Sequence, residues 1–349
     1  EGRKLLESMK DCGWERAKEP LKNSPRFGKI AQSQPLVNIM SQLTFAEAEY
    51  AIKKRTTRRE KFLARLEELV PWQKLKQQLS KGYQKTGPGR PPYPLETMLR
   101  IHIMQLVYNL SDPEMEDYLY EVESMRRFAH LRLCESIPDE TTILNFRHYV
   151  EMHKFGKKIF DTINQHLADK GLRLREGTIV DATIIAAPTS TKNADGERDP
   201  EMHQVKKGNE WHHGMKMHIG VDDGLGLIHS IATTAANEHD ITQTDKLLHG
   251  DEQRVWGDAG YLGVDKREEH AAREVDWFIA MRPGKRAKLA KSDPLAQAEK
   301  MKASVRAKVE HAFFYIKRVF HYNKVRYRGL AKNTNRLYVL AGLANLLRM

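Results

Sequence analysis

The sequence has only two cysteines, Cys12 and Cys134, in 349 residues. Two thiols cannot build a disulfide framework or a cysteine-based zinc site, which excludes the small secreted scaffolds that depend on them. No run approaches the roughly 18–20 apolar residues that a membrane-spanning helix needs, so we expect no membrane association. The first residues, Glu1 to Lys4, lack the apolar centre of a secretion signal. We therefore expect a cytoplasmic protein.

Acidic residues are fewer than basic ones, and this imbalance is the first indication of what the protein binds. The chain has 58 Lys and Arg against 46 Asp and Glu, a formal net charge of +12. Between Arg282 and Lys332, 15 basic residues accompany three acids. A basic stretch of this density attracts polyanions through phosphate contacts and counterion release. A solvated basic face is the alternative, but the acid Glu310 lies at a helical position inside the run and favours a specific site.

The length and the change of pattern along the chain predict more than one unit, because domains typically have about 100–200 residues. Residues 1–39 show no sustained periodicity, and we expect a loosely ordered leader there. Residues 40–172 read as an all-α DNA-binding domain. Residues 173–349 read as a mixed α/β catalytic domain.

The helical half carries clear start signals. Phe62 to Leu69 is apolar at helical spacing, and Ser111 with Glu114 forms a capping box. Short helices with tight connections resemble a helix-turn-helix arrangement, although an ordinary all-α accessory domain fits equally well. Within this half, Arg147 is a candidate DNA contact. Arg90, in a Gly-Arg-Pro segment, is either a minor-groove contact or part of a simple linker.

The second half contains β-branched and apolar runs separated by turn residues, followed by a long amphipathic helix. A strand, a hairpin around Gly224, a short helix, two more strands and a late helix describe a ribonuclease-H-like fold with a mixed sheet. The expected strands are 178–185, 216–222, 227–234, 254–258 and 275–280, and the expected helices are 240–248 and 303–320.

Three carboxylates occupy positions at which such a fold converges. Asp181 lies within the first strand, Asp258 ends the fourth strand beside it, and Glu310 lies on the late helix. A buried aspartate in an apolar strand is costly unless it is paired or bound to a metal. Two Mg²⁺ ions held by carboxylates can activate a water or a 3′-hydroxyl and stabilise the leaving oxygen. We therefore expect Asp181, Asp258 and Glu310 to be catalytic metal ligands.

The late helix places basic residues beside this acid. Arg306, Glu310 and Lys317 cluster on one line at the edge of the apolar face, which suits gripping phosphates next to the metals. An Arg306–Glu310 salt bridge on a surface helix is the simpler alternative.

Further contacts to DNA are expected outside the acidic site. The polar stretch from Thr189 to Gly208 contributes Lys206 and Lys207, although it is equally well a solvated loop, and Lys216 and Arg318 are additional candidates. Several histidines between His203 and His239 permit a zinc site, but phosphate or base contacts suit them better. Trp211 and Trp256 are expected in the core, with base stacking as the alternative.

Several segments together resemble the bacterial insertion-sequence DDE transposases of the insertion-sequence-five group, from about Met40 to the end of the chain. The segments are Tyr93 to Arg100, Tyr108 to Asp112, Val180 to Ile185, Thr233 to Asp240, Gly257 to Tyr261, and Arg306 to Lys317. The resemblance implies that Asp181, Asp258 and Glu310 are catalytic and that the cofactor is Mg²⁺, with Mn²⁺ as a substitute.

The match departs from the pattern of the wider group at one position. Relatives carry a Tyr-x₂-Arg-x₃-Glu-x₆-Lys signature, in which Arg306, Glu310 and Lys317 match but Ala303 replaces the tyrosine. Only 52 residues separate Asp258 from Glu310, which leaves no room for the large β-rich insertion of some relatives. A hairpin-based cleavage pathway should therefore not be assumed.

The sequence thus predicts a nucleoid-associated bacterial transposase that binds the terminal inverted repeats of double-stranded DNA. It would hydrolyse the 3′ ends and join them to target DNA, working on two ends as a homodimer. The alternatives are a ribonuclease-H-like nuclease without strand transfer and a transposase-derived DNA-binding protein without catalysis. The presence of all three acids favours an enzyme.

Overall fold

The computed structural model describes residues 50, 52–83, 91–172, 176–194 and 196–349. The expected leader, residues 1–39, and the candidate contact Arg90 therefore lie outside the described residues. Within the described part of the chain, no helix is both long and apolar enough to cross a membrane.

The N-terminal half is helical, as predicted, and its helices begin where side chains satisfy the first backbone N–H groups. Thr57 and Ser111 each head a capping box. Asp139 accepts a 2.7 Å hydrogen bond from the backbone N–H of Thr142. The helices are α3 (Arg58–Leu69), α4 (Trp72–Leu79), α5 (Leu95–Tyr108), α6 (Asp112–Glu121), α7 (Glu123–Phe128), α8 (Glu140–Met152) and α9 (Phe155–Asp169).

The C-terminal half is built on a six-stranded mixed sheet. Its strands are β1 (Gly177–Ala186), β2 (His203–Lys207), β3 (Glu210–Asp222), β4 (Ile228–Ala235), β5 (Arg254–Gly257) and β6 (Asp276–Ile279). β3 pairs antiparallel with β1, β2 and β4, whereas β1, β5 and β6 are parallel neighbours in that order. This mixed sheet confirms the predicted ribonuclease-H-like α/β fold and the pairing of the first strand with the strand that precedes Asp258.

The connection between β3 and β4 forms where Gly224 predicted a turn. The Asp222 carboxylate accepts backbone hydrogen bonds from Leu225 and Leu227, both 2.6 Å long. Gly226 adopts a φ of 73°, a left-handed conformation that glycine enters at little cost. The turn therefore closes on a buried carboxylate.

Several elements differ from the prediction. β2 lies in the stretch from Thr189 to Gly208 that was expected to be a polar loop, and it forms a hairpin with the start of β3. The helix predicted over 240–248 is a 3₁₀ turn, η2 (Asp240–Gln243), followed by α10 (Thr244–Leu247). Other short elements are η3 (Ala259–Tyr261), η4 (Val264–Lys266), η5 (Glu268–His270) and α11 (Pro283–Arg286).

The late helix is longer than predicted and changes its winding. α12 spans Pro294–Phe314 and begins nine residues before Ala303, because Asp293 caps it and Pro294 suits the first turn. A π-helical segment, η6 (Tyr315–Val319), continues it. Such π segments are rare and frequently occur at functional sites.

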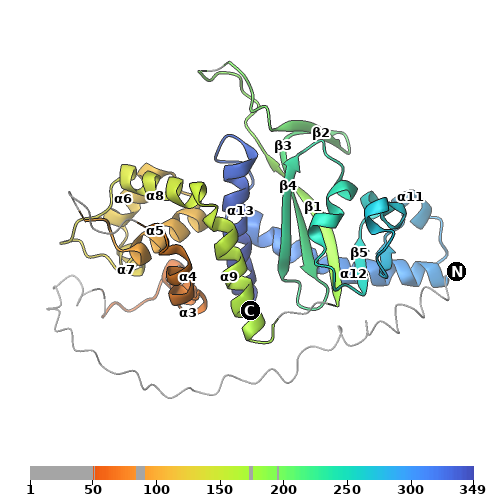
Figure 1. Ribbon diagram of the computed structural model, residues 1–349, viewed down its shortest axis with the longest axis horizontal. Coiled ribbons are helices and arrows are strands. Elements are labelled where there is room, and N and C mark those ends of the chain that lie inside the picture. The colour runs from red at the N-terminus through yellow and green to blue at the C-terminus, as the bar shows by residue number, and fades with distance from the viewer. Residues whose placement is uncertain (1–49, 51, 84–90, 173–175, 195) are drawn as a thin grey trace.

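The last helix, α13 (Leu330–Arg348), joins the two halves and was not predicted. It packs against α9 on one side and β4 on the other. Figure 1 shows α9 and α13 side by side between the α3–α8 region and the sheet. One apolar core consequently runs from α3 through α13 to the sheet.

Candidate active site

Asp181 occupies the middle of β1, the central strand of the sheet. Its Oδ1 atom accepts a 2.7 Å hydrogen bond from the backbone N–H of Ala182. The side chain is partly buried, whereas Ile179 and Val180 just before it are fully buried. The strand therefore holds a carboxylate at the edge of an apolar interior, where its negative charge is poorly solvated.

The electrostatics of Asp181 connect it to the other two predicted acids. Burial, together with the negative charges of Asp258 and Glu310, raises the pKa of the Asp181 carboxyl to about 7, against the opposing effects of the Ala182 backbone N–H and the Arg306 guanidinium. Like charges disfavour one another's ionised form only at short range. Asp181, Asp258 and Glu310 therefore lie in one electrostatic environment, with the Arg306 guanidinium beside them.

Asp258 and Glu310 reach this environment from different elements. Asp258 directly follows β5 and caps η3, accepting a 2.7 Å hydrogen bond from the backbone N–H of Gly260 at its Oδ1 atom. Glu310 is an exposed residue of α12, one turn after the half-buried Arg306. The Nε atom of Arg306 is buried and has no hydrogen-bond partner among the described residues. An unpaired guanidinium N–H beside carboxylates is suited to a phosphate oxygen.

Two hollows open at these residues, and both have basic walls. One, of about 490 Å³, is lined by Thr183, Glu310, His311, Phe313, Phe314, Lys317 and Arg318. The other, of about 470 Å³, is lined by Asp258, Ala259, Ala280, Met281, Pro283, Arg286, Ala287 and Arg306. Each hollow thus combines one of the acids with two cationic side chains.

The carboxylates fit a hard divalent cation by chemistry, because Mg²⁺ and Mn²⁺ prefer oxygen ligands. The raised pKa of Asp181, caused first by burial and then by the neighbouring negative charges, shows that its ionised form is disfavoured, and a bound cation would offset this. Within the described residues, no three Asp, Glu, His or Cys side chains are close enough together to hold a metal ion as they stand. The three acids are thus neighbours without direct coordination geometry, and their role as metal ligands stays a prediction.

The raised pKa of Asp181 has a consequence for stability. In the unfolded chain this carboxyl ionises near pH 3.8, whereas in the folded protein it holds its proton to about pH 7. Stability therefore falls as the pH rises between these values, and the penalty is complete above pH 7. Asp181→Asn removes the penalty. Relative to the unchanged protein, we expect the free energy of unfolding of the variant to increase by about 2–3 kcal/mol more at pH 8 than at pH 5, since one pKa unit corresponds to about 1.4 kcal/mol.

Urea unfolding in a chelating buffer at both pH values measures this difference. Asp265→Asn is the matched control, since it makes the same chemical change at an exposed residue of the short helix η4. An equal gain at pH 5 and pH 8 would refute the assignment of the shift to Asp181.

The predicted phosphate contacts separate into two groups. Lys206, Lys207 and Arg318 are exposed, as a contact to DNA requires. Lys317 is half-buried on the π-helical segment, and its ammonium group donates a 2.7 Å hydrogen bond to the carbonyl of Ile184 in β1. Burial lowers the pKa of Lys317. It therefore ties η6 to β1 while lining the hollow beside Glu310.

Arg147 and Lys216 take positions that differ from the predicted ones. The Arg147 guanidinium is buried, forms ion pairs with Asp112 and Glu151, and lies over the ring of Tyr327. Lys216 forms an ion pair with a carboxylate on η2, and its side chain is 12% exposed. Both cations already have internal partners, so we do not include them in the proposed DNA-binding surface.

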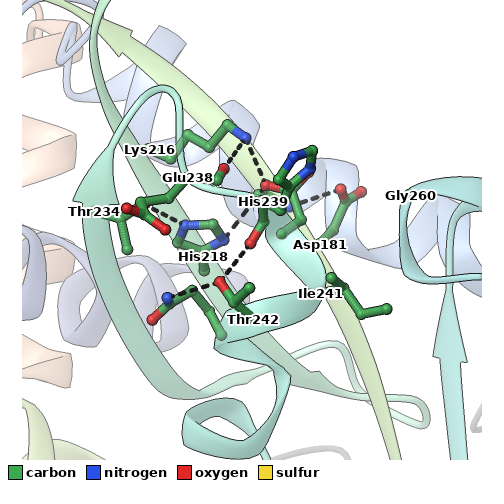
Figure 2. Close-up of polar contacts among 12 residues, drawn as sticks. Asp181, Lys216, His218, Thr234, Glu238, His239, Ile241, Thr242 and Gly260 are labelled. Atoms are coloured by element: carbon green, nitrogen blue, oxygen red, sulfur yellow. Dashed lines mark hydrogen bonds and ion pairs between the residues drawn. The ribbon is translucent and has the colours of Figure 1, made fainter. Parts of the chain in front are cut away.

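Sequence reasoning assigned no role to Asp240, which forms a second polar cluster with Lys216 and His218 beside Asp181. Figure 2 shows Asp181 together with Lys216 and His218 on β3 and with Gly260 after β5. Asp240, the first residue of η2, pairs with Lys216 and lies near His218. Asp240 is the last residue of the Thr233 to Asp240 segment, one of those that resemble the transposases. That position was the one feature of the sequence that could have indicated a role for Asp240.

The two tryptophans have opposite environments, and only one matches the expectation. Trp256 is 1% exposed and donates a 2.9 Å hydrogen bond from Nε1 to Asp223, as a core residue should. Trp211 is 67% exposed, on the β2–β3 hairpin opposite Lys206. The core prediction for Trp211 is therefore wrong, because the N-terminal end of β3 extends past β1 and β4 and pairs there with β2 alone.

A larger hollow lies away from the acids. It measures about 910 Å³ and has a mainly apolar lining that includes Met152, Leu330 and Tyr338, between α8 and α13. It contains neither Asp181, Asp258 nor Glu310. The chemistry, rather than the size of the hollow, therefore identifies the candidate active site.

Comparison with known proteins gives matches to both halves. A family described as "Transposase DDE domain" matches residues 172–346, and a "Transposase domain (DUF772)" matches residues 50–149. Among solved structures, the cryo-EM structure of the piggyBac transposase synaptic complex with hairpin DNA is similar at a TM-score of 0.39 and 13% identity. The similarity covers 81% of this chain and 72% of that one. Membership of the insertion-sequence-five group stays a prediction, but the two family matches show that this chain belongs to the DDE transposases.

Proposed function

We propose that this transposase binds the terminal inverted repeats of its element as duplex DNA, hydrolyses the 3′ ends and joins them to target DNA. The carrying observation is that Asp181, Asp258 and Glu310 share one electrostatic environment next to the unpaired Arg306 N–H. Asp258 and Arg306 line one basic hollow and Glu310 lines the other, so a phosphodiester at either hollow would meet an acid and a cation.

Each side chain has a distinct role in this proposal. Asp181, Asp258 and Glu310 hold Mg²⁺, or Mn²⁺ in its place, through carboxylate oxygens. When bound, two such cations supply an activated water or 3′-hydroxyl and stabilisation of the leaving oxygen. Arg306, which lines the hollow beside Asp258, donates from its guanidinium group to a phosphate oxygen and so orients the scissile bond. Lys317 and Arg318 neutralise phosphates along the neighbouring hollow.

The DNA-binding surface extends from the site to the β2–β3 hairpin. Lys206, Lys207 and Trp211 are exposed there, and Lys206 faces Trp211 across the strands. Lysines that neutralise phosphates release counterions, and an exposed indole offers a face on which a base can stack.

We assign recognition of the repeats to the helical region, residues 40–172. Two ends require two active sites, so we propose a homodimer on DNA, acting at the bacterial nucleoid.

The test is an assay with the DNA ends that flank the coding sequence. A labelled end fragment, a target plasmid and Mg²⁺ are incubated with the full chain, and the products are separated on a denaturing gel. Products in which the 3′ end is joined to the plasmid support transposition. Nicking without joining would instead indicate a nuclease without strand transfer. Binding without nicking would indicate a DNA-binding protein without catalysis.

A further inference from the structure

Asp240 is held on one side by a cationic partner inside the protein. Its Oδ1 atom lies 2.9 Å from the Lys216 ammonium, which also donates a 2.6 Å hydrogen bond to the carbonyl of Glu238. Lys216 thereby ties β3 to the segment that leads into η2. The position of the Asp240 carboxylate is thus set by the sheet, although η2 itself is a single turn.

His218 forms the floor of this cluster. Its side chain is completely buried, and Nε2 lies 2.8 Å from the Thr234 hydroxyl on β4. Nδ1 lies 3.7 Å from the Oδ1 atom of Asp240. Burial lowers the pKa of His218 to about 4, so the imidazole is neutral at physiological pH. Lys216 is therefore the cation that compensates Asp240, while His218 restricts its position.

The other oxygen of Asp240 faces the turn that carries Asp258. A Cβ atom added at Gly260 would lie 3.8 Å from Oδ2 of Asp240 and 2.9 Å from Oδ1 of Asp258. The two carboxylates thus flank the same glycine, where η2 packs against η3. Figure 2 shows Gly260 in the same close-up as Lys216, His218 and Asp181.

A second observation comes from Tyr261, the residue after that glycine. Its side chain is fully buried, and its hydroxyl has no hydrogen-bond partner among the described residues. The negative charges of Asp181, Asp240 and Asp258 all act on this hydroxyl. A buried phenol normally finds a partner, because an unmade hydrogen bond is costly. Here the nearby acceptors are the carboxylates themselves, so the hydroxyl lies within the acidic cluster and can donate to one of them once they draw together.

We propose that Asp240 is a fourth acidic side chain of the active site and that, with the Tyr261 hydroxyl, it positions Asp181 and Asp258 for divalent cations. This inference rests on the proposed metal-dependent function. Asp240 places its Oδ2 atom beside the turn of Asp258, and the ion pair with Lys216 holds η2 in that position. Tyr261 orients a carboxylate by donating its proton in a hydrogen bond. Both act through Asp181 and Asp258, as positioning residues.

The test measures Mn²⁺ binding to the full chain by isothermal titration calorimetry, without DNA. Asp240→Asn keeps the shape of the side chain and should weaken Mn²⁺ binding about 10- to 100-fold, as loss of groups that orient metal ligands does. Tyr261→Phe should also weaken it, while the melting temperature without metal stays the same or rises, because the hydroxyl has no bond to lose. The control is Asp245→Asn. Asp245 lies on the adjacent α10, and its exposed carboxylate pairs with Arg273.

Two further results separate the possible failures. Unchanged Mn²⁺ affinity in both Asp240→Asn and Tyr261→Phe, with weakened binding in Asp258→Asn, overturns this inference and leaves the proposed function standing. Unchanged affinity in Asp258→Asn as well would overturn the metal-dependent function itself. If Asp240→Asn does not fold, Tyr261→Phe decides, since a purely structural tyrosine would lower the melting temperature and leave Mn²⁺ binding unchanged.

Discussion

Asp258→Asn is expected to abolish cleavage of the transposon ends while the protein still binds them. The substitution removes the negative charge that would hold a cation, and loss of a group that stabilises developing charge typically costs about 10²–10³-fold in rate. The asparagine Oδ1 can still accept the hydrogen bond from Gly260, so η3 keeps its cap. DNA affinity should stay the same or rise slightly, because one negative charge beside the phosphates is lost.

Cleavage is measured by gel assay in Mg²⁺ and binding by mobility shift in a chelating buffer. Asp265→Asn provides the comparison, because it makes the same chemical change at an exposed position seven residues further along the chain. Cleavage by Asp258→Asn at the rate of the control would remove Asp258 from the active site.

Asp223→Ala is expected to cost about 3–5 kcal/mol of folding stability, the usual effect of breaking a buried ion pair. The Asp223 side chain is 8% exposed and lies 2.5 Å from Nε of Arg254. It also accepts the indole N–H of Trp256. Removing it takes away the buried carboxylate that accepts from Nε of Arg254 and from the indole N–H of Trp256. Chemical denaturation, followed by tryptophan fluorescence, gives the free energy of unfolding.

The same arginine supplies a control. Glu176 lies 3.5 Å from Nη2 of Arg254, but its side chain is 68% exposed. Glu176→Ala should therefore cost less than about 1 kcal/mol, as exposed ion pairs do. Equal losses in the two variants would show that burial of the Asp223–Arg254 pair is not what stabilises this end of β1 and β5.

The elements that the sequence predicted well depend on neighbouring residues. The capping box at Ser111 and the β-branched run around Asp181 each involve residues close together in the chain. Helix ends and strand patterns follow from such local bonds and periodicity. The same reasoning missed β2, because its polar composition resembles a loop, and placed the start of α12 too late because the cap at Asp293 was overlooked.

The candidate site was predictable in part. Asp181 and Asp258 are acids within and at the end of strands, and Glu310 lies at the edge of an apolar helix face, which is sufficient to suggest that they meet. The internal partners of the basic side chains were not predictable. Lys216 and Arg147 read as phosphate contacts because their charge was visible, whereas the carboxylates that pair with them come from other elements.

From the sequence alone, the α/β class, three candidate acids and the resemblance to a transposase could be inferred, because periodicity and sequence motifs depend on residues close together in the chain. Only the tertiary structure decided that Asp240 and Tyr261 lie at the acidic cluster, that Lys216 faces inward and that α13 packs between the helices and the sheet. These features depend on which surfaces are buried against each other, and burial determines whether a charge is solvated, paired or available to a ligand.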